Sequence, residues 1–126
     1  MAVSQGFVDL LQEILVPLGA VSVRRMFGGA GLHCDGVMFA LLSDDALYLK
    51  ADETTRPAFE AEGLGPFGYS TKDGDRVLTS YWRAPERLLD EPEECVHWAR
   101  QAVGVARRRA AEKAKPAPRK RRRSPG

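Results

Sequence analysis

The sequence predicts an α+β domain, in which a single antiparallel sheet carries an N-terminal, a middle and a C-terminal helix on one side. Three observations predict it. Apolar residues near the N-terminus have helical spacing, short β-type segments between turn signals follow, and a capped, alanine-rich segment lies near the C-terminus. At 126 residues the chain has the usual size of one domain and can bury a core without disulfides or metal.

The first helix is expected over residues 5–17. Its apolar residues recur at intervals of three and four, and Ser4 is a suitable N-cap. The residues with this spacing are Phe7, Leu10, Leu11, Ile14, Leu15 and Leu18. Pro17 lacks the backbone N–H that a further turn needs, so the helix should end there.

An antiparallel meander is expected next. Its four strands are expected over residues 21–27, 32–34, 37–42 and 47–50. Asp35-Gly36 is a dipeptide that a type I′ hairpin turn favours, and residues 43–46 form the following turn.

The second half of the chain repeats the alternation of helix and strand. A middle helix is expected over residues 52–62, and a hairpin should pair residues 67–71 with 77–83. The last helix is expected to begin after Asp90, a capping residue, and to run to about Lys113.

The formal net charge of +2 hides two regions of opposite sign. Residues 107–126 hold ten Lys or Arg and one Glu, a net charge of +9, so residues 1–106 carry −7. We expect residues 1–106 to form the domain, and residues 107–126 to form a basic helix end followed by a disordered tail. The sequence has no candidate membrane span or signal peptide, and two cysteines without a CxxC spacing fit a cytoplasmic setting.

Residues 24–31, Arg-Arg-Met-Phe-Gly-Gly-Ala-Gly, are the most informative stretch of the chain. Gly28, Gly29 and Gly31 are expected to be structural, in a tight bend between strands, because glycine reaches positive φ and lets backbones approach closely. No Gly-Lys-Ser/Thr follows, and the next segment is a strand rather than a helix. Neither a nucleotide nor any other cofactor is therefore expected.

No catalytic or metal-binding group is expected either. His33 and Cys34 are adjacent on a strand, so their side chains should point to opposite faces. Cys95 and His97 are two residues apart on a helix and should not face each other. The paired aspartates lie in turns, where they bond their own backbone.

Arg24, Arg25, Trp82 and Arg83 form the candidate interaction surface, because arginine and aromatic side chains dominate interface energetics. Trp82 follows Tyr81 on a strand, so one of the two rings should be in the core and the other partly exposed. A purely structural role for these aromatics is the alternative. One of the two adjacent arginines is expected to be held by an acidic partner.

The C-terminal tail is the candidate nucleic-acid-binding segment. Its cations are Arg119, Lys120, Arg121, Arg122 and Arg123. Such a cluster binds phosphate backbones through counterion release, without reading sequence. The alternative is a solubilising terminus with no partner.

Five blocks in a fixed order resemble the N-terminal domain of the TfoX/Sxy family of bacterial competence regulators. They are RMFGGAGL (25–32), GVMFAL (36–41), DALYLKAD (45–52), PFGY (66–69) and SYWRAP (80–85). The resemblance covers about residues 7–108 and implies the α+β fold. It also implies a positive regulator of DNA-uptake genes that works with the cyclic-AMP receptor protein, and it implies no catalytic residue. Two-domain members continue into a helical domain where this sequence has its basic tail.

We therefore expect a non-enzymatic regulatory or interaction module with a protein partner in transcription. The tail should add weak, nonspecific nucleic-acid binding. The alternative is a small-ligand binder or enzyme that uses a cleft between the glycine bend and the Tyr81-Trp82 strand. A homodimer formed through a sheet edge or the last helix is a further possibility.

Overall fold

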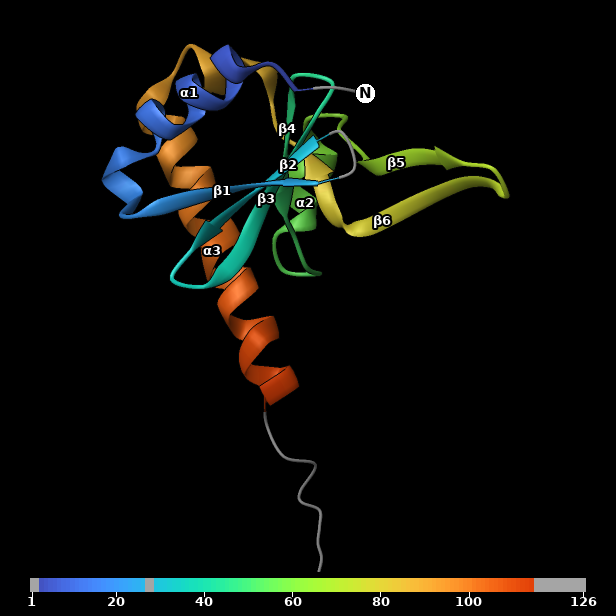
Figure 1. The fold of residues 1–126 in the computed structure, drawn as a ribbon. Coiled ribbons are helices and arrows are strands. Elements are labelled where there is room, and N and C mark those ends of the chain that lie inside the picture. The colour runs from blue at the N-terminus through green and yellow to red at the C-terminus, as the bar shows by residue number, and fades with distance from the viewer. Residues whose placement is uncertain (1–2, 27–28, 115–126) are drawn as a thin grey trace, which may run out of the picture.

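The computed structural model describes residues 3–26 and 29–114. Phe27, Gly28 and the expected tail at residues 119–123 lie outside the described residues. Within them, one antiparallel sheet is packed against helices on one side, which confirms the predicted α+β class (Figure 1).

The sheet has six strands in the order β1-β2-β3-β4-β6-β5. They are β1 (Val21–Met26), β2 (Gly29–Cys34), β3 (Val37–Ser43), β4 (Ala46–Lys50), β5 (Pro66–Thr71) and β6 (Gly74–Arg83). β2 begins three residues before its expected start, so Gly29 and Gly31 pair within a strand instead of forming a bend. β6 also begins early, because the hairpin turns through Lys72 and Asp73 alone.

The turns of the meander follow their local sequence. Asp35 and Gly36 both have positive φ, 55° and 83°, as the expected type I′ turn requires. Asp44 and Asp45 also have positive φ, 53° and 55°, so they form a second two-residue turn between β3 and β4. Asp45 has a second role, because its carboxylate accepts a 2.9 Å hydrogen bond from the backbone N–H of Ser4.

The first helix, α1 (Gln5–Ile14), is three residues shorter than expected. Ser4 is its N-cap and accepts a hydrogen bond from the N–H of Phe7. The chain then tightens into the 3₁₀ turn η1 (Val16–Leu18), because Pro17 has no N–H to continue the α-helical pattern.

The other two helices begin later than expected, the middle helix by four residues and the last helix by one. α2 (Arg56–Ala61) is preceded by a turn in which the Asp52 carboxylate accepts hydrogen bonds from the N–H groups of Thr54 and Thr55. A 3₁₀ turn, η2 (Glu86–Leu89), separates β6 from α3 (Pro92–Ala114). The expected domain boundary after residue 106 therefore falls inside α3, which continues through the first basic residues.

The core lies between one face of the sheet and the helices. Its fully buried side chains include Leu11, Leu15, Leu32, Phe39, Leu42, Leu49, Leu88 and Cys95. Figure 1 shows two parts that leave this body: the β5–β6 hairpin projects sideways, and the last turns of α3 extend beyond the sheet.

Candidate interaction surface

The second face of the sheet carries a row of side chains that runs across five strands. Register places Arg24, Gly31, Leu41, Tyr48 and Arg83 opposite one another on β1, β2, β3, β4 and β6. Because successive strand residues alternate between faces, this row lies opposite the core. No helix in the described part of the chain packs on it.

The neighbouring row faces the helices. It contains Val23, Leu32, Ala40, Leu49 and Trp82, which register aligns in the same way. All five belong to the core or pack against it. The sheet therefore separates Arg24 and Arg83 from Trp82.

The predicted grouping of Trp82 with the arginines is therefore wrong, because Trp82 faces the core. It is 8% exposed, its Nε1–H donates to the Thr79 carbonyl at 2.9 Å, and its ring lies 6.2 Å from that of Phe59. Tyr81 is also 8% exposed, so the expectation that one of the two rings would be partly exposed is wrong. The Lys50 ammonium, 4.8 Å from the centre of the Tyr81 ring, contributes to covering it.

Arg25 also lies apart from Arg24 and Arg83. Its guanidinium donates to the Val3 carbonyl at 2.9 Å and to Oε1 of Gln5 at 2.8 Å, so it fastens the N-terminal segment to β1. An acidic partner was expected for one of the two adjacent arginines, but among the described residues neither forms an ion pair, and Arg25 has two neutral acceptors instead.

The glycines of the sequence motif make room in the sheet. A Cβ on Gly29 would lie 2.4 Å from the Leu42 carbonyl oxygen, and a Cβ on Gly31 would lie 2.9 Å from atoms of Met26 and Met38. Neither glycine has positive φ, so close packing is the reason for glycine here. The space over Gly31 is filled by methionine side chains.

Aromatic side chains extend this face onto the projecting hairpin. The Tyr48 and Phe67 rings meet edge to face at 4.8 Å, Phe67 stacks on Tyr69 at 5.7 Å, and the Arg83 guanidinium lies 5.8 Å from the Tyr48 ring centre. Leu78 is paired with Phe67 across the hairpin. We call Tyr48, Phe67, Tyr69, Leu78 and Arg83 the aromatic strip.

The hairpin exposes part of this strip to solvent. β6 pairs with β4 only through Tyr81–Arg83, and its earlier residues pair with β5 alone. Tyr69 and Leu78 are 41% and 39% exposed. A two-stranded ribbon is only marginally stable by itself, so exposed apolar side chains on it do not serve a core of its own. Because exposed apolar residues lie together on it, the hairpin is part of the candidate interaction surface.

Sequence reasoning found the two arginines of this face but missed its aromatic residues. The missed signal is the alternation of large residues over 67–69, opposite Leu78 on the next strand. It becomes visible only when β5 and β6 are in register.

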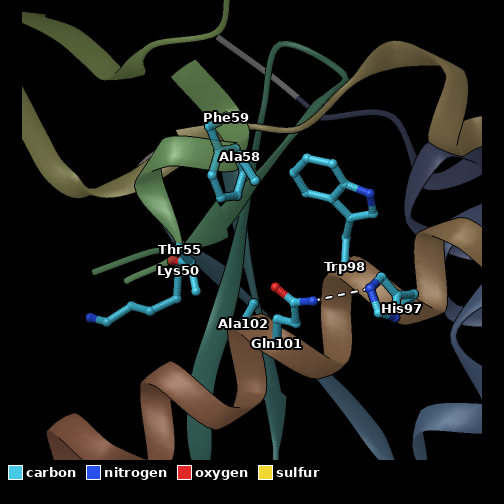
Figure 2. Close-up of a pocket in the computed structure, with 8 residues that line it drawn as sticks. All are labelled: Lys50, Thr55, Ala58, Phe59, His97, Trp98, Gln101 and Ala102. Atoms are coloured by element: carbon cyan, nitrogen blue, oxygen red, sulfur yellow. Dashed lines mark hydrogen bonds between the residues drawn. The ribbon is translucent and has the colours of Figure 1, made fainter. Parts of the chain in front are cut away.

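A shallow hollow lies on the helical side, away from the glycine motif (Figure 2). Its volume is about 140 Å³, below the roughly 300 Å³ of ordinary small-molecule sites. It is lined by Lys50, Thr55, Ala58, Phe59, His97, Trp98, Gln101 and Ala102. The side chains of His97 and Gln101 bond each other at 3.0 Å instead of converging on a common point.

The local environments of Cys34, Cys95 and His33 favour the neutral forms of these side chains. Burial raises the pKa of the Cys34 thiol and raises that of Cys95 to about 11, so neither is a ready nucleophile. Burial and the nearby Arg24 lower the pKa of His33, whose buried Nδ1 has no hydrogen-bond partner. Among the described residues, no three His, Cys, Asp or Glu side chains gather as metal ligands.

In the described ranges, no helix has the combined length and apolar character needed to cross a bilayer.

The fold and this surface define a small α+β domain whose sheet has one face packed by helices and one face free of them in the described residues. A model of the TfoX N-terminal domain matches residues 13–106, so the chain belongs to the TfoX N-terminal domain family. Protein Sxy from Escherichia coli strain K12 is 30% identical to it over 95 residues. The match covers 75% of this chain but only 45% of that protein. The family is one of competence-related regulators and is not a known enzyme family.

Proposed function

We propose that this protein is a non-enzymatic regulatory module that binds a protein partner of the transcription apparatus through the aromatic strip. The observation that carries the proposal is the exposed, aromatic and arginine-containing end of the helix-free sheet face. Tyrosine and arginine are enriched among the residues that dominate interface energetics. Family membership favours regulation over catalysis.

The basic tail adds the second part of the proposal. Residues 119–123 are five consecutive cations, while residues 1–106 carry a net charge of −7. The body therefore repels a phosphate backbone that the tail attracts. This asymmetry supports a tethered arrangement, in which the tail holds nucleic acid and the sheet face contacts a protein.

The test of the sheet face measures binding to purified cyclic-AMP receptor protein, the partner that the family resemblance implies. Replacing Tyr69 and Leu78 together by serine should weaken the affinity about thirtyfold or more, because a loss of about 1 kcal/mol at each exposed anchor adds up to about 2 kcal/mol. Val16→Ser is the matched control, since Val16 is 67% exposed in η1 on another part of the surface. Equal affinities for all three proteins would refute this role of the strip.

The alternative binding partner of the aromatic strip is a second copy of the same chain. Light scattering on the wild type and on the Tyr69→Ser, Leu78→Ser variant separates the two cases. A dimer that the variant converts to a monomer would assign the strip to self-association and contradict the proposed partner.

The test of the tail measures fluorescence anisotropy of a labelled duplex. The comparison protein is the full chain with serine at positions 119–123. If the tail contacts about five phosphates, log K should fall against log salt with a slope of roughly −4 to −5. Equal binding by both proteins would refute a nucleic-acid role for the tail.

A further inference from the structure

Three cations gather where β4 ends beside the last turns of α3. Lys50 is the last residue of β4 and lines the hollow together with residues of α3. In Figure 2 its ammonium points away from the Phe59 and Trp98 rings. Arg109 and Lys113 are four residues apart, so they share one face of α3.

An ion pair holds this part of α3 against the strand end. Nη2 of Arg108 lies 3.1 Å from Oδ2 of Asp52, two residues after Lys50. Arg109 and Lys113 follow directly on α3, and both are exposed. We call Lys50, Arg109 and Lys113 the cationic cluster.

The neighbouring arginines of α3 pair with aspartates, whereas two of the three cations of the cluster have no such partner among the described residues. Arg107 pairs with Asp35, and Arg108 pairs with Asp52. Arg109 has only a 4.0 Å contact with Glu112. Among the described residues, Lys50 and Lys113 have no carboxylate within ion-pair distance.

The three positive charges also act on one another. Burial lowers the pKa of Lys50, and the charges of Lys113 and then Arg109 lower it further. Like charges held together repel, and an anion placed among them would relieve that repulsion.

We propose that the cationic cluster is a phosphate-binding surface for nucleic acid, which continues the contacts of the basic tail onto the folded body. This inference rests on the proposed nucleic-acid role of the tail. It adds a basic site on the folded part of the chain, formed by the end of β4 and the last turns of α3, next to the point where the tail begins.

The chain length supports a common path for the two sites. Arg119 is the fifth residue after Ala114, the last residue of α3. Such a segment spans at most about 18 Å, so the tail cations begin within a few phosphate spacings of Lys113. One nucleic-acid backbone can therefore contact the cluster and the tail together.

The experiment measures the salt dependence of duplex binding by anisotropy, using full-length variants. Arg109→Gln with Lys113→Gln removes two exposed cations and should reduce the slope of log K against log salt by about 1.8, that is, about 0.9 for each lost phosphate contact. Adding Lys50→Gln should reduce it by about 0.9 more. Lys72→Gln with Arg76→Gln is the control, because it removes two cations from the distant hairpin.

The outcomes separate this inference from the proposed function. One outcome is that the salt slope is unchanged in the cluster variants, while binding is still lost when residues 119–123 are replaced by serine. This result would overturn the proposed phosphate contacts of the cluster and leave the role of the tail intact. An equal reduction in the hairpin control would show an effect of net charge and also overturn the cluster. If the wild type does not bind, the nucleic-acid role and the cluster fail together.

Discussion

Asp52 gives the sharpest prediction about stability. Burial raises the pKa of its carboxyl group, but hydrogen bonds from the Thr54 hydroxyl, the Arg108 guanidinium and the backbone N–H groups of Thr54 and Thr55 outweigh it and lower the pKa to about 2. The ordinary value is 3.8. This difference corresponds to about 2 kcal/mol of stability. Because the side chain of Arg108 is 55% exposed and therefore screened, we expect about 1 to 2 kcal/mol.

The sign follows from the lowered pKa. The folded state holds Asp52 ionised more strongly than the unfolded state does, so the contribution is complete above about pH 4 and disappears as the pH falls toward 2. Asp52→Asn should therefore destabilise the protein at neutral pH and have little effect near pH 2.

The assay is urea unfolding of the wild type and Asp52→Asn at about pH 7 and about pH 2.5. Asp73→Asn, in the exposed turn between β5 and β6, is the control and should change stability by less than about 0.5 kcal/mol. An equal loss for Asp52→Asn at both pH values would refute the reasoning, because the carboxylate charge would then not be the source of the stability.

Three further predictions concern the packed interior. Gly29→Ala should lower the free energy of unfolding by about 3 kcal/mol, measured by thermal or urea unfolding, because the added Cβ would meet the Leu42 carbonyl. Gly65→Ala is the control and should be nearly neutral, because a Cβ there meets nothing within 4 Å. Similar losses of stability in the two variants would contradict this reasoning. Burial raises the pKa of Tyr81 to about 12, so ultraviolet titration should show a phenol step near pH 12 that Tyr81→Phe removes, and folded-state stability should fall above about pH 10. An unchanged titration curve in that variant would be the contrary result. Burial raises the pKa of Cys95 to about 11, so at about pH 8 this thiol should react with a thiol reagent only when the protein unfolds. Rapid labelling of Cys95 in the native protein would contradict this prediction.

Local patterns predicted the elements of this fold, because their causes lie within a few residues. Asp35-Gly36 specifies its turn through the backbone angles that these residues tolerate, and the apolar spacing before Pro17 specifies α1. Where the sequence prediction was wrong by a turn of helix, as at Pro17 and Asp52, a local hydrogen-bonding choice decided the boundary.

The candidate interaction surface could not be predicted in the same way, because its composition depends on the register between strands. Arg24 and Arg83 are 59 positions apart in the chain, and only the pairing of β4 with β6 puts them at the two ends of one row. The same pairing turns Trp82 into the core. The sequence pointed to arginine and aromatic side chains, but it contained no information on which face of the sheet each of them would occupy.

The projection of the β5–β6 hairpin and of α3 from separate parts of the body has a consequence for simultaneous binding. A protein seated on the hairpin would leave the end of α3 uncovered, so neither ligand would have to displace the other. If the domain between them does not change shape, the two affinities should be independent, with a coupling free energy near zero. The molecule would then act as an adaptor, which increases the local concentration of one ligand near the other without altering the intrinsic affinity for either.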